Sequence, residues 1–232
     1  MRNYRSSTGP FQERPFFKSE EIESLCQAEL KQFGLLPEHP APIRIERFVE
    51  KRFGITPLYE ELPSGVLGFT RFNENGVEAI VVSRSLAEED TKSSERRIST
   101  TLAHEAGHGL LHAHLFAVGA QPERLFGEEF DPKVPRILCR DPDNSTRYDG
   151  RWWEYQANQT IGALLLPKIL VEKALDSTIL EASGLFAVPR LNASKREKAV
   201  ELIAHTFNVN PAVARIRLDQ LFPHSESAQL PL

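Results

Sequence analysis

Apolar residues along the chain recur at two spacings, and these predict where helices and strands lie. Helical spacing is found in six segments, namely 19–34, 43–53, 96–116, 152–166, 167–175 and 194–222. In the last segment Asn210 is followed by Pro211, a pair that suits a helix start, so we expect two helices joined by a short turn there. Gly34 and Gly54 suit the ends of the first two helices.

The stretch between the second and third helical segments has the pattern of strands. GVLGFTRF and VEAIVVSR are rich in β-branched and aromatic residues, and the turn-forming run NENG separates them at hairpin length. ITPLYEEL could form a further strand. The chain is therefore expected to be α+β, with a small, mostly antiparallel sheet accompanied by helices.

Three segments show neither spacing. Residues 1–18 are polar and contain prolines, which predicts a loose arm. Residues 85–95 are expected to be a solvated connection, and residues 117–150 a long irregular loop with at most one short turn or strand. A loop of that length in a compact domain is either functional or disordered.

Charge and composition exclude several classes of protein. The 232 residues carry a formal net charge of -4, which gives no overall electrostatic attraction to nucleic acid. The two cysteines, Cys26 and Cys139, are far apart in the sequence, which argues against a disulfide framework and a thiolate metal cluster. The N-terminus lacks an apolar signal region and the apolar runs are too short to cross a bilayer, so we expect a cytoplasmic protein without a membrane partner.

The candidate chemistry lies in the third helical segment, in the sequence TLAHEAGHGLLH. His104 and His108 are four residues apart, which places their imidazoles on one helix face, separated by about 40° in projection and about 6 Å in rise. Two ring nitrogens at this spacing can bind one Zn²⁺ ion. Glu105 lies about 100° around the helix from His104, where it can act as the catalytic base that takes a proton from water.

A solvated, histidine-rich helix face is the alternative interpretation of this motif. Gly107 and Gly109 argue against it, because each costs a helix interior about 1 kcal/mol relative to alanine, which suggests that another element approaches closely here. His112 lies one turn further along, out of reach of a metal held by His104 and His108. It therefore supports the ligands, faces the substrate or has a purely structural role.

A catalytic zinc site needs a third protein ligand, and the helical segment 152–166 offers a carboxylate. Glu154 lies near the start of this segment, with Asn158 one turn later on the same face. A carboxylate on an otherwise apolar face is costly to bury unless it is paired or bound to a metal. The alternative is that Glu154 is a first-turn glutamate favoured by the helix dipole.

Three pieces of the chain resemble the ImmA/IrrE family of zinc metallopeptidases. RRISTTLAHEAGHGLLH resembles the active-site helix of that family, WWEYQANQTIGALLLP resembles its second helix, and GVLGFTRFNENGVEAIVVS resembles the hairpin before the active-site helix. Together they cover roughly residues 40 to 175. The resemblance implies a minimal zincin-like fold, similar to the gluzincins, in which the small sheet lies beside the active-site helix.

The resemblance also implies roles for individual residues. His104, His108 and Glu154 would bind one Zn²⁺ ion, and Glu105 would be the catalytic base. Manganese or iron can also occupy a site made of two histidines and a glutamate. The residues predicted to contact the ligands or the substrate are His112, Tyr155 and Asn158. Candidates for the group that stabilises the oxyanion are His112, Tyr148 and Tyr155.

The function that the resemblance implies is a zinc metalloendopeptidase, a hydrolase that cleaves a helix-turn-helix transcriptional repressor. Such repressors often control a mobile element or a stress regulon, and cleavage relieves repression. An extended substrate is expected to add to an exposed edge of the 66–83 hairpin. The competing hypothesis is a non-proteolytic regulatory protein, an antirepressor or toxin–antitoxin partner, with a structural metal site.

The predicted organisation has three parts. They are an N-terminal arm and helix (1–40), a zincin-like metallopeptidase domain (41–190) that contains the irregular loop, and a C-terminal helical segment (191–232). The last part resembles a helix-turn-helix and is locally basic. Direct contact with DNA is one interpretation of it, but acidic residues are interleaved with the basic ones, which favours helices that close the core.

Overall fold

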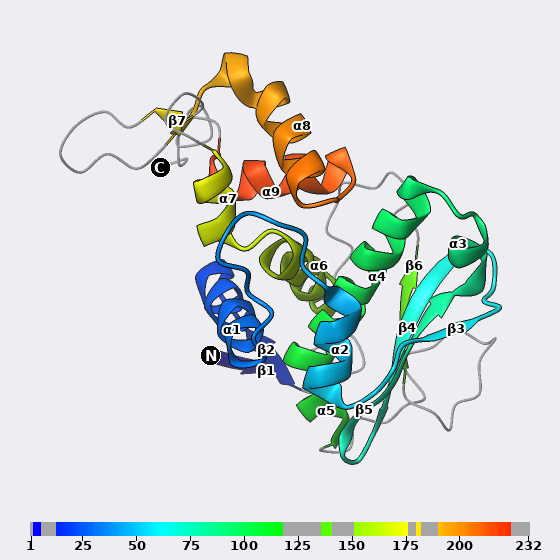
Figure 1. Ribbon diagram of the computed structural model, residues 1–232. Helices are drawn as coiled ribbons and strands as arrows, with labels where there is room; N and C mark the ends of the chain where they lie inside the picture. Colours follow the sequence, from blue (N-terminus) through cyan, green and yellow to red (C-terminus); the bar gives the residue numbers. More distant parts are fainter. Residues whose placement is uncertain are drawn as a thin grey trace.

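The computed structural model describes residues 2–5, 13–117, 136–140, 151–175, 180–181 and 190–223. Within them, a sheet and three helices form successive layers (Figure 1). Helix α4 (Lys92–Leu111) packs against the sheet, α6 (Trp152–Leu165) packs against α4, and α1 (Ser19–Gln32) packs on α6. This mixed architecture confirms the predicted α+β class.

Counted over the described residues, the sheet has four strands. Their order is β3 (Leu58–Glu60), β5 (Gly76–Ser83), β4 (Val66–Asn73) and β6 (Arg136–Arg140). β4 pairs antiparallel with β5 and with β6, whereas β3 runs parallel to β5, which confirms a small, mostly antiparallel sheet. Part of the predicted exposed hairpin edge is covered: β6 pairs with the outer side of β4, and β3 pairs with β5 only at residues 81–83, so residues 76–80 of β5 have no strand partner on that side among the described residues.

Alternate residues of β4 point toward α4. A Cβ added at Gly68 would lie 2.6 Å from Thr101 Cγ2 on α4, so the strand approaches the helix too closely for a larger residue. Thr70, the next residue on this face, is fully buried and donates a hydrogen bond to Glu105. Phe69, between them, belongs to a separate small apolar cluster. The two-residue period of the strand thus selects the side chains that reach α4.

The start of α4 differs from the prediction. The helix begins at Lys92 rather than Arg96, because Thr91 and Ser94 form a capping box: Ser94 N donates to Thr91 Oγ1 at 3.1 Å and Thr91 N donates to Ser94 Oγ at 3.0 Å. The first turn is polar, so apolar spacing does not reveal it. The expected solvated connection before it contains a further short helix, α3 (Arg84–Glu88).

The remaining helices before the C-terminal segment lie close to their predicted positions. They are α2 (Ile45–Phe53), α5 (Ala113–Ala117) and α7 (Lys168–Ala174). α2 ends at Gly54, whose φ of 71° is in the left-handed region that favours glycine. α4 ends before His112, which separates it from α5 where one continuous helix was expected. A two-stranded sheet of β7 (Leu180–Glu181) and β8 (Arg190–Leu191) follows α7.

The C-terminal segment contains a short 3₁₀ turn, η2 (Ala193–Lys195), followed by α8 (Arg196–Thr206) and α9 (Pro211–Leu221). This confirms the predicted pair of helices around a short turn. Apolar faces of both helices join the main core. Basic residues of the two helices form the ion pairs Arg196–Asp219, Arg215–Glu197 and Arg217–Glu23.

The N-terminal residues form a hairpin instead of the predicted loose arm. β1 (Arg2–Arg5) pairs antiparallel with β2 (Glu13–Phe16). Pro15 is buried, and its carbonyl oxygen accepts a hydrogen bond of 2.8 Å from the side-chain amide of Gln156 on α6. A contact between residues so far apart in the chain leaves no mark in local composition, which explains why polarity misled the prediction.

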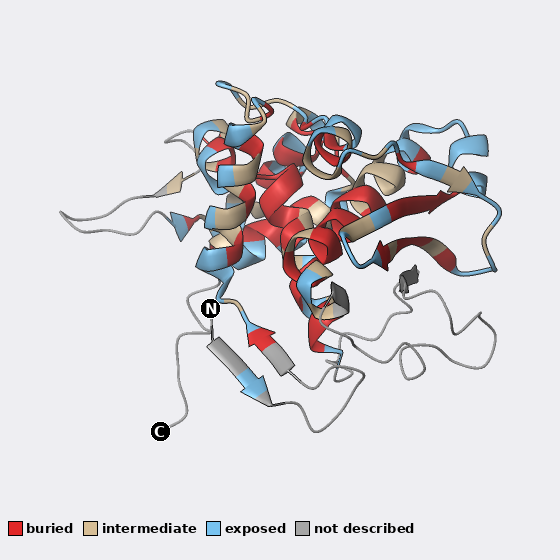
Figure 2. Ribbon diagram, turned by 90° about the horizontal axis from the view of Figure 1, so that it is seen from below, coloured by how far each residue is buried: buried red, intermediate tan, exposed pale blue. Residues whose placement is uncertain are grey.

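Helices from all parts of the chain share one hydrophobic core (Figure 2). It includes the fully buried Leu30 of α1, Leu102 of α4, Leu164 of α6 and Leu218 of α9. The N-terminal and C-terminal helices therefore pack on the same core as the segment between them. In the part of the chain that the structure describes, no helix has the length and apolar character needed to span a membrane.

Candidate metal centre

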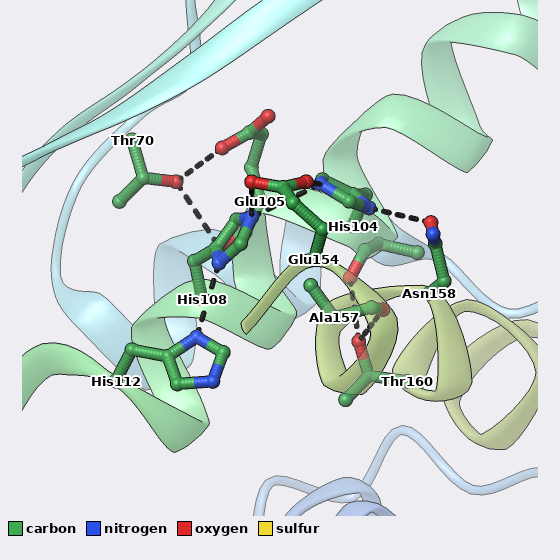
Figure 3. A network of polar contacts seen from close by, with 10 residues as sticks. Thr70, His104, Glu105, His108, His112, Glu154, Ala157, Asn158 and Thr160 are labelled. Carbon is green, nitrogen blue, oxygen red and sulfur yellow. Dashed lines mark hydrogen bonds and ion pairs between the residues drawn. The ribbon is translucent and has the colours of Figure 1, made fainter. Parts of the chain in front are cut away.

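Helices α4 and α6 bring two histidines and a glutamate to one point. His104 and His108 project from α4, and Glu154 projects toward them from the first turn of α6 (Figure 3). His104 Nε2 lies 3.0 Å from His108 Nε2 and 3.1 Å from Glu154 Oε2, and His108 Nε2 lies 3.7 Å from Glu154 Oε1. The structure thus brings together the three residues proposed from the sequence as ligands, and we call them the triad.

The spacing of the triad fits a single metal ion. Ligand atoms at about 2.0–2.1 Å from a tetrahedral zinc ion are about 3.3 Å from one another. The separations of 3.0, 3.1 and 3.7 Å lie on both sides of that value, and one ligand atom from each residue lies within 4.8 Å of the others. The triad could therefore hold a metal ion, and its nitrogen and oxygen donors suit zinc, manganese or iron.

The hydrogen bonds of His104 show which of its ring nitrogens faces the site. Nδ1 lies 3.1 Å from Asn158 Oδ1, an oxygen that can only accept, so Nδ1 carries a proton. In the neutral ring, Nε2 then directs a lone pair at a carboxylate oxygen of Glu154 only 3.1 Å away. Two acceptors so close repel each other unless a cation lies between them. In the metal-free protein a proton between His104 Nε2 and Glu154 Oε2 removes this repulsion. In the metal-bound protein the metal ion does so.

Burial and the neighbouring charges set the protonation of each triad residue in the metal-free protein. Burial disfavours the charged form of His104, but the hydrogen bond and charge of Glu154 outweigh burial and raise the pKa of His104. Burial acts to raise the pKa of Glu154, yet the charges and hydrogen bonds of both histidines hold it well below its ordinary value. Burial lowers the pKa of His108. The ionised carboxylate of Glu154 and the neutral ring of His108 are the forms that bind metals, whereas His104 must give up a proton when a metal ion binds.

Glu105 lies beside the triad and is fully buried. Its Oε2 accepts a hydrogen bond of 2.6 Å from the hydroxyl of Thr70 on β4. Burial raises the pKa of Glu105 to about 8, against the opposing effects of the His104 charge and the Thr70 hydrogen bond. Oε1 is buried without a hydrogen-bond partner among the described residues. Oε1 is therefore free to accept a hydrogen bond from one further donor, such as water. Such a bond is favourable because a buried oxygen without a partner is costly.

The other predicted site residues lie at different places around the triad. Asn158 contacts His104, and His112 contacts the ring nitrogen of His108 that points away from the triad, with 3.0 Å between the two Nδ1 atoms. His112 therefore supports a residue of the triad and lies outside the triad itself. Tyr155 is 54% exposed, so it can reach only a group at the surface. Tyr148 lies outside the described residues.

Two buried polar residues of the site are missing from the sequence-based prediction. Thr70 holds Glu105, and Gln156 holds His112, with 3.0 Å between Gln156 Oε1 and His112 Nε2. A polar residue in the middle of an apolar strand was the available signal for Thr70. Gln156 lies two residues after Glu154 and therefore on another side of α6, so spacing from the ligand does not point to it.

Close packing explains the two glycines of the motif. A Cβ at Gly107 would lie 2.0 Å from Thr160 Oγ1 on α6, and one at Gly109 would lie 2.7 Å from Phe53 Cζ at the end of α2. This confirms the predicted close approach. The alternative of a solvated histidine-rich face is wrong, since the three histidines of the motif are all buried.

Comparisons with known proteins add no assignment to this geometry. The chain matches no protein-family model and no curated protein. The resemblance to the ImmA/IrrE metallopeptidases thus rests on the residues of the three segments quoted above. What the site does is therefore inferred from its side chains and their arrangement.

Proposed function

We propose that the protein is a zinc-dependent endopeptidase with a zincin-like fold, in which His104, His108 and Glu154 bind one Zn²⁺ ion and Glu105 is the catalytic base. One observation carries this proposal: within the described residues, the buried Oε1 of Glu105 has no hydrogen-bond partner beside a triad that could hold a metal. A structural metal site needs its ligands but has no use for such a base. The family resemblance supports the same roles.

The chemistry follows from the position of Glu105. When bound, zinc supplies a Lewis acid that polarises a carbonyl group and acidifies water. Thr70 holds Oε2 of Glu105, which leaves Oε1 to accept the proton of a water molecule. Glu105 then passes this proton to the leaving amine. Its pKa of about 8 in the metal-free protein lies near neutral pH, where a group can both take up and release a proton.

The proposed substrate is a helix-turn-helix transcriptional repressor of a mobile element or a stress regulon, met in the cytoplasm and inactivated by cleavage. This part rests on the family resemblance. Because β6 pairs with β4 and β3 pairs only with residues 81–83 of β5, an extended substrate would pair with the outer edge of β6 or with residues 76–80 of β5, and not with β4. Contact of the C-terminal helices with DNA is not part of the proposal.

A matched pair of variants tests the chemistry. The zinc-loaded protein is incubated with the candidate repressor, cleavage is followed by mass spectrometry, and bound metal is measured in parallel. Glu105→Gln keeps the shape of the side chain but removes the base, so we expect retained zinc and a cleavage rate about 10²- to 10⁴-fold lower. Glu154→Ala is expected to lose both the bound zinc and the cleavage activity. Cleavage by Glu105→Gln at the wild-type rate would overturn the proposal.

A second candidate is a non-proteolytic regulatory protein, an antirepressor or toxin–antitoxin partner, with a structural metal site. Burial of the triad favours it, since His104 is 3% and His108 0% exposed. Structural sites are closed, whereas catalytic sites keep one position open. In this case Glu105→Gln would release the repressor from its operator as well as the wild type does, and no repressor fragment would be formed.

A further inference from the structure

A run of buried hydrogen bonds leads from the N-terminal hairpin to His108. Gln156 Nε2 donates to the carbonyl oxygen of Pro15 at 2.8 Å. Gln156 Oε1 lies 3.0 Å from His112 Nε2, and His112 Nδ1 lies 3.0 Å from His108 Nδ1. His108 and His112 are 0% exposed and Gln156 is 4% exposed, so water does not compete for these bonds. We call this run the relay.

The carbonyl oxygen of Pro15 sets the direction of every bond in the relay. Because it can only accept, it selects the amide nitrogen of Gln156 and turns the amide oxygen toward His112. That oxygen requires a proton on His112 Nε2, which leaves a lone pair on Nδ1 of the neutral ring. His108 Nδ1 must then be the donor. The lone pair of His108 is therefore on Nε2, the atom that faces His104 and Glu154.

Packing and burial keep the relay in this form. The ring of Trp152 packs edge-on against His112, with 5.5 Å between ring centroids and 78° between planes. His108 and His112 are both fully buried, and burial disfavours a charged imidazole, which favours the neutral form of both rings. Each neutral ring then has one donor and one acceptor, as the two ends of the relay require.

We propose that His112 and Gln156 are positioning residues that fix the ring orientation and tautomer of His108, so that its Nε2 lone pair is presented to the metal ion. This inference rests on the proposed metal site and extends it to residues that are not ligands. A metal-bound histidine usually donates its other N–H to a carboxylate, a carbonyl or water. Here a neutral histidine, oriented by an amide, takes that place and joins the site to the N-terminal hairpin.

Two substitutions at His112 separate positioning from packing. His112→Asn keeps an acceptor oxygen near the position of Nδ1. The leucine of His112→Leu has the same branched shape as that asparagine but has no acceptor. The zinc affinity of the full chain is measured by competition with a chromophoric chelator. We expect His112→Leu to weaken zinc binding about 10- to 100-fold and His112→Asn by less than about threefold. If His112 only fills space in the core, the apolar leucine is the milder change and the order reverses.

Gln156→Leu breaks the relay one step further from the metal. We expect it to weaken zinc binding by about 3- to 10-fold, less than His112→Leu does. His205→Leu, on the exposed side of α8, is the matched control for loss of an imidazole and should leave the affinity unchanged. The visible absorption of the Co²⁺-loaded protein should change with His112→Leu and not with His205→Leu, because it reports ligand geometry.

Nitrogen-15 NMR of the histidine rings in the metal-free full chain tests the tautomers directly. We expect the proton on Nδ1 of His108 and on Nε2 of His112. A proton on Nε2 of His108 in the neutral ring would overturn the positioning role, as would wild-type zinc affinity in both His112→Leu and Gln156→Leu. Zinc binding by the wild-type protein distinguishes failure of this inference from failure of the proposed function. If the wild-type protein binds no zinc, the proposed function fails as well. If it binds zinc but the variants bind it equally well, only the positioning role fails.

Discussion

At the scale of single residues, Gly107 sets the distance between the two helices that carry the triad. Thr160 of α6 occupies the space where a side chain at this position would lie. Its hydroxyl donates to Ala157 O at 2.7 Å and lies 3.3 Å from Ala103 O of α4. Glu154 stands on the same helix as Thr160, so the close contact at Gly107 also brings Glu154 to the histidines.

Gly107→Ala tests this close contact. A methyl group 2.0 Å from Thr160 Oγ1 forces the helices apart, so we expect a loss of about 1–3 kcal/mol in the free energy of unfolding. The loss should occur although alanine favours a helix interior by about 1 kcal/mol. Urea denaturation measures it. In a Thr160→Ala background the same substitution should cost less, and equal costs in both backgrounds would contradict the explanation.

Which site residues can be predicted from sequence depends on where their partners lie. The sequence predicts His104, Glu105 and His108 as site residues because one helix turn places them together. The sequence also predicts Glu154, because it is an acidic residue on an otherwise apolar helix face. Thr70 and Gln156 act through partners on other elements, and no local spacing encodes those contacts. The same reason hides the contact between Gln156 and Pro15.

At the scale of elements, Arg217 of α9 joins helices from both ends of the chain. Its Nε donates to Leu166 O at 3.0 Å, at the end of α6, and its guanidinium pairs with Glu23 of α1. Glu23 also accepts a hydrogen bond of 2.7 Å from the backbone nitrogen of Lys168, at the start of α7. The side chains of Arg217 and Glu23 are 6% and 16% exposed, so this ion pair is largely removed from water.

Arg217→Met should therefore be costly. Methionine replaces the apolar stem but leaves a mostly buried carboxylate and a carbonyl oxygen without their partner, so we expect a loss of about 3 kcal/mol in the free energy of unfolding. Arg215→Met is the matched control. Arg215 pairs with Glu197 at an exposed position, where an ion pair contributes about 1 kcal/mol or less. Losses of similar size in the two variants would show that Arg217 has no special role.

Elements with a continuous apolar stripe, such as α1, α6 and α8, are predictable because burial of that stripe determines them. The first turn of α4 is not predictable in this way, because the helix starts at a capping box, which apolar spacing does not reveal. The hairpin of β1 and β2 escapes prediction because its residues are polar and its partner, α6, lies far along the chain. β6 was foreseen only as one possible strand in a loop, and its pairing with β4 depends on a contact that spacing does not encode.

At the scale of the whole molecule, the site concentrates ionisable groups where the core is otherwise apolar. The layers of sheet, α4 and α6 enclose Glu105, His108 and His112, which are all 0% exposed. Burial of such groups ties their protonation to folding, because the unfolded chain returns them to water. The stability of the metal-free protein should therefore depend on pH in a direction that each shifted pKa determines.

For Glu105 this direction is a loss of stability as pH rises. Its ordinary pKa is 4.5, and burial raises the pKa in the folded, metal-free protein to about 8. Below the ordinary value both states hold the proton. Between the two values only the folded state holds it, so the free energy of unfolding falls by about 1.4 kcal/mol per pH unit until the folded carboxyl ionises.

Glu105→Gln is neutral at every pH and removes this contribution, which allows the prediction to be measured as a difference. In urea denaturation with a chelator present, the variant should gain stability over the wild type steadily from pH 5 to pH 8 and then gain no more. Other groups of the site titrate in both proteins and largely cancel in the difference. A difference that stays constant from pH 5 to pH 8 would mean that Glu105 is already ionised in the folded metal-free protein, held by a cation that the chelator did not remove or by water at Oε1.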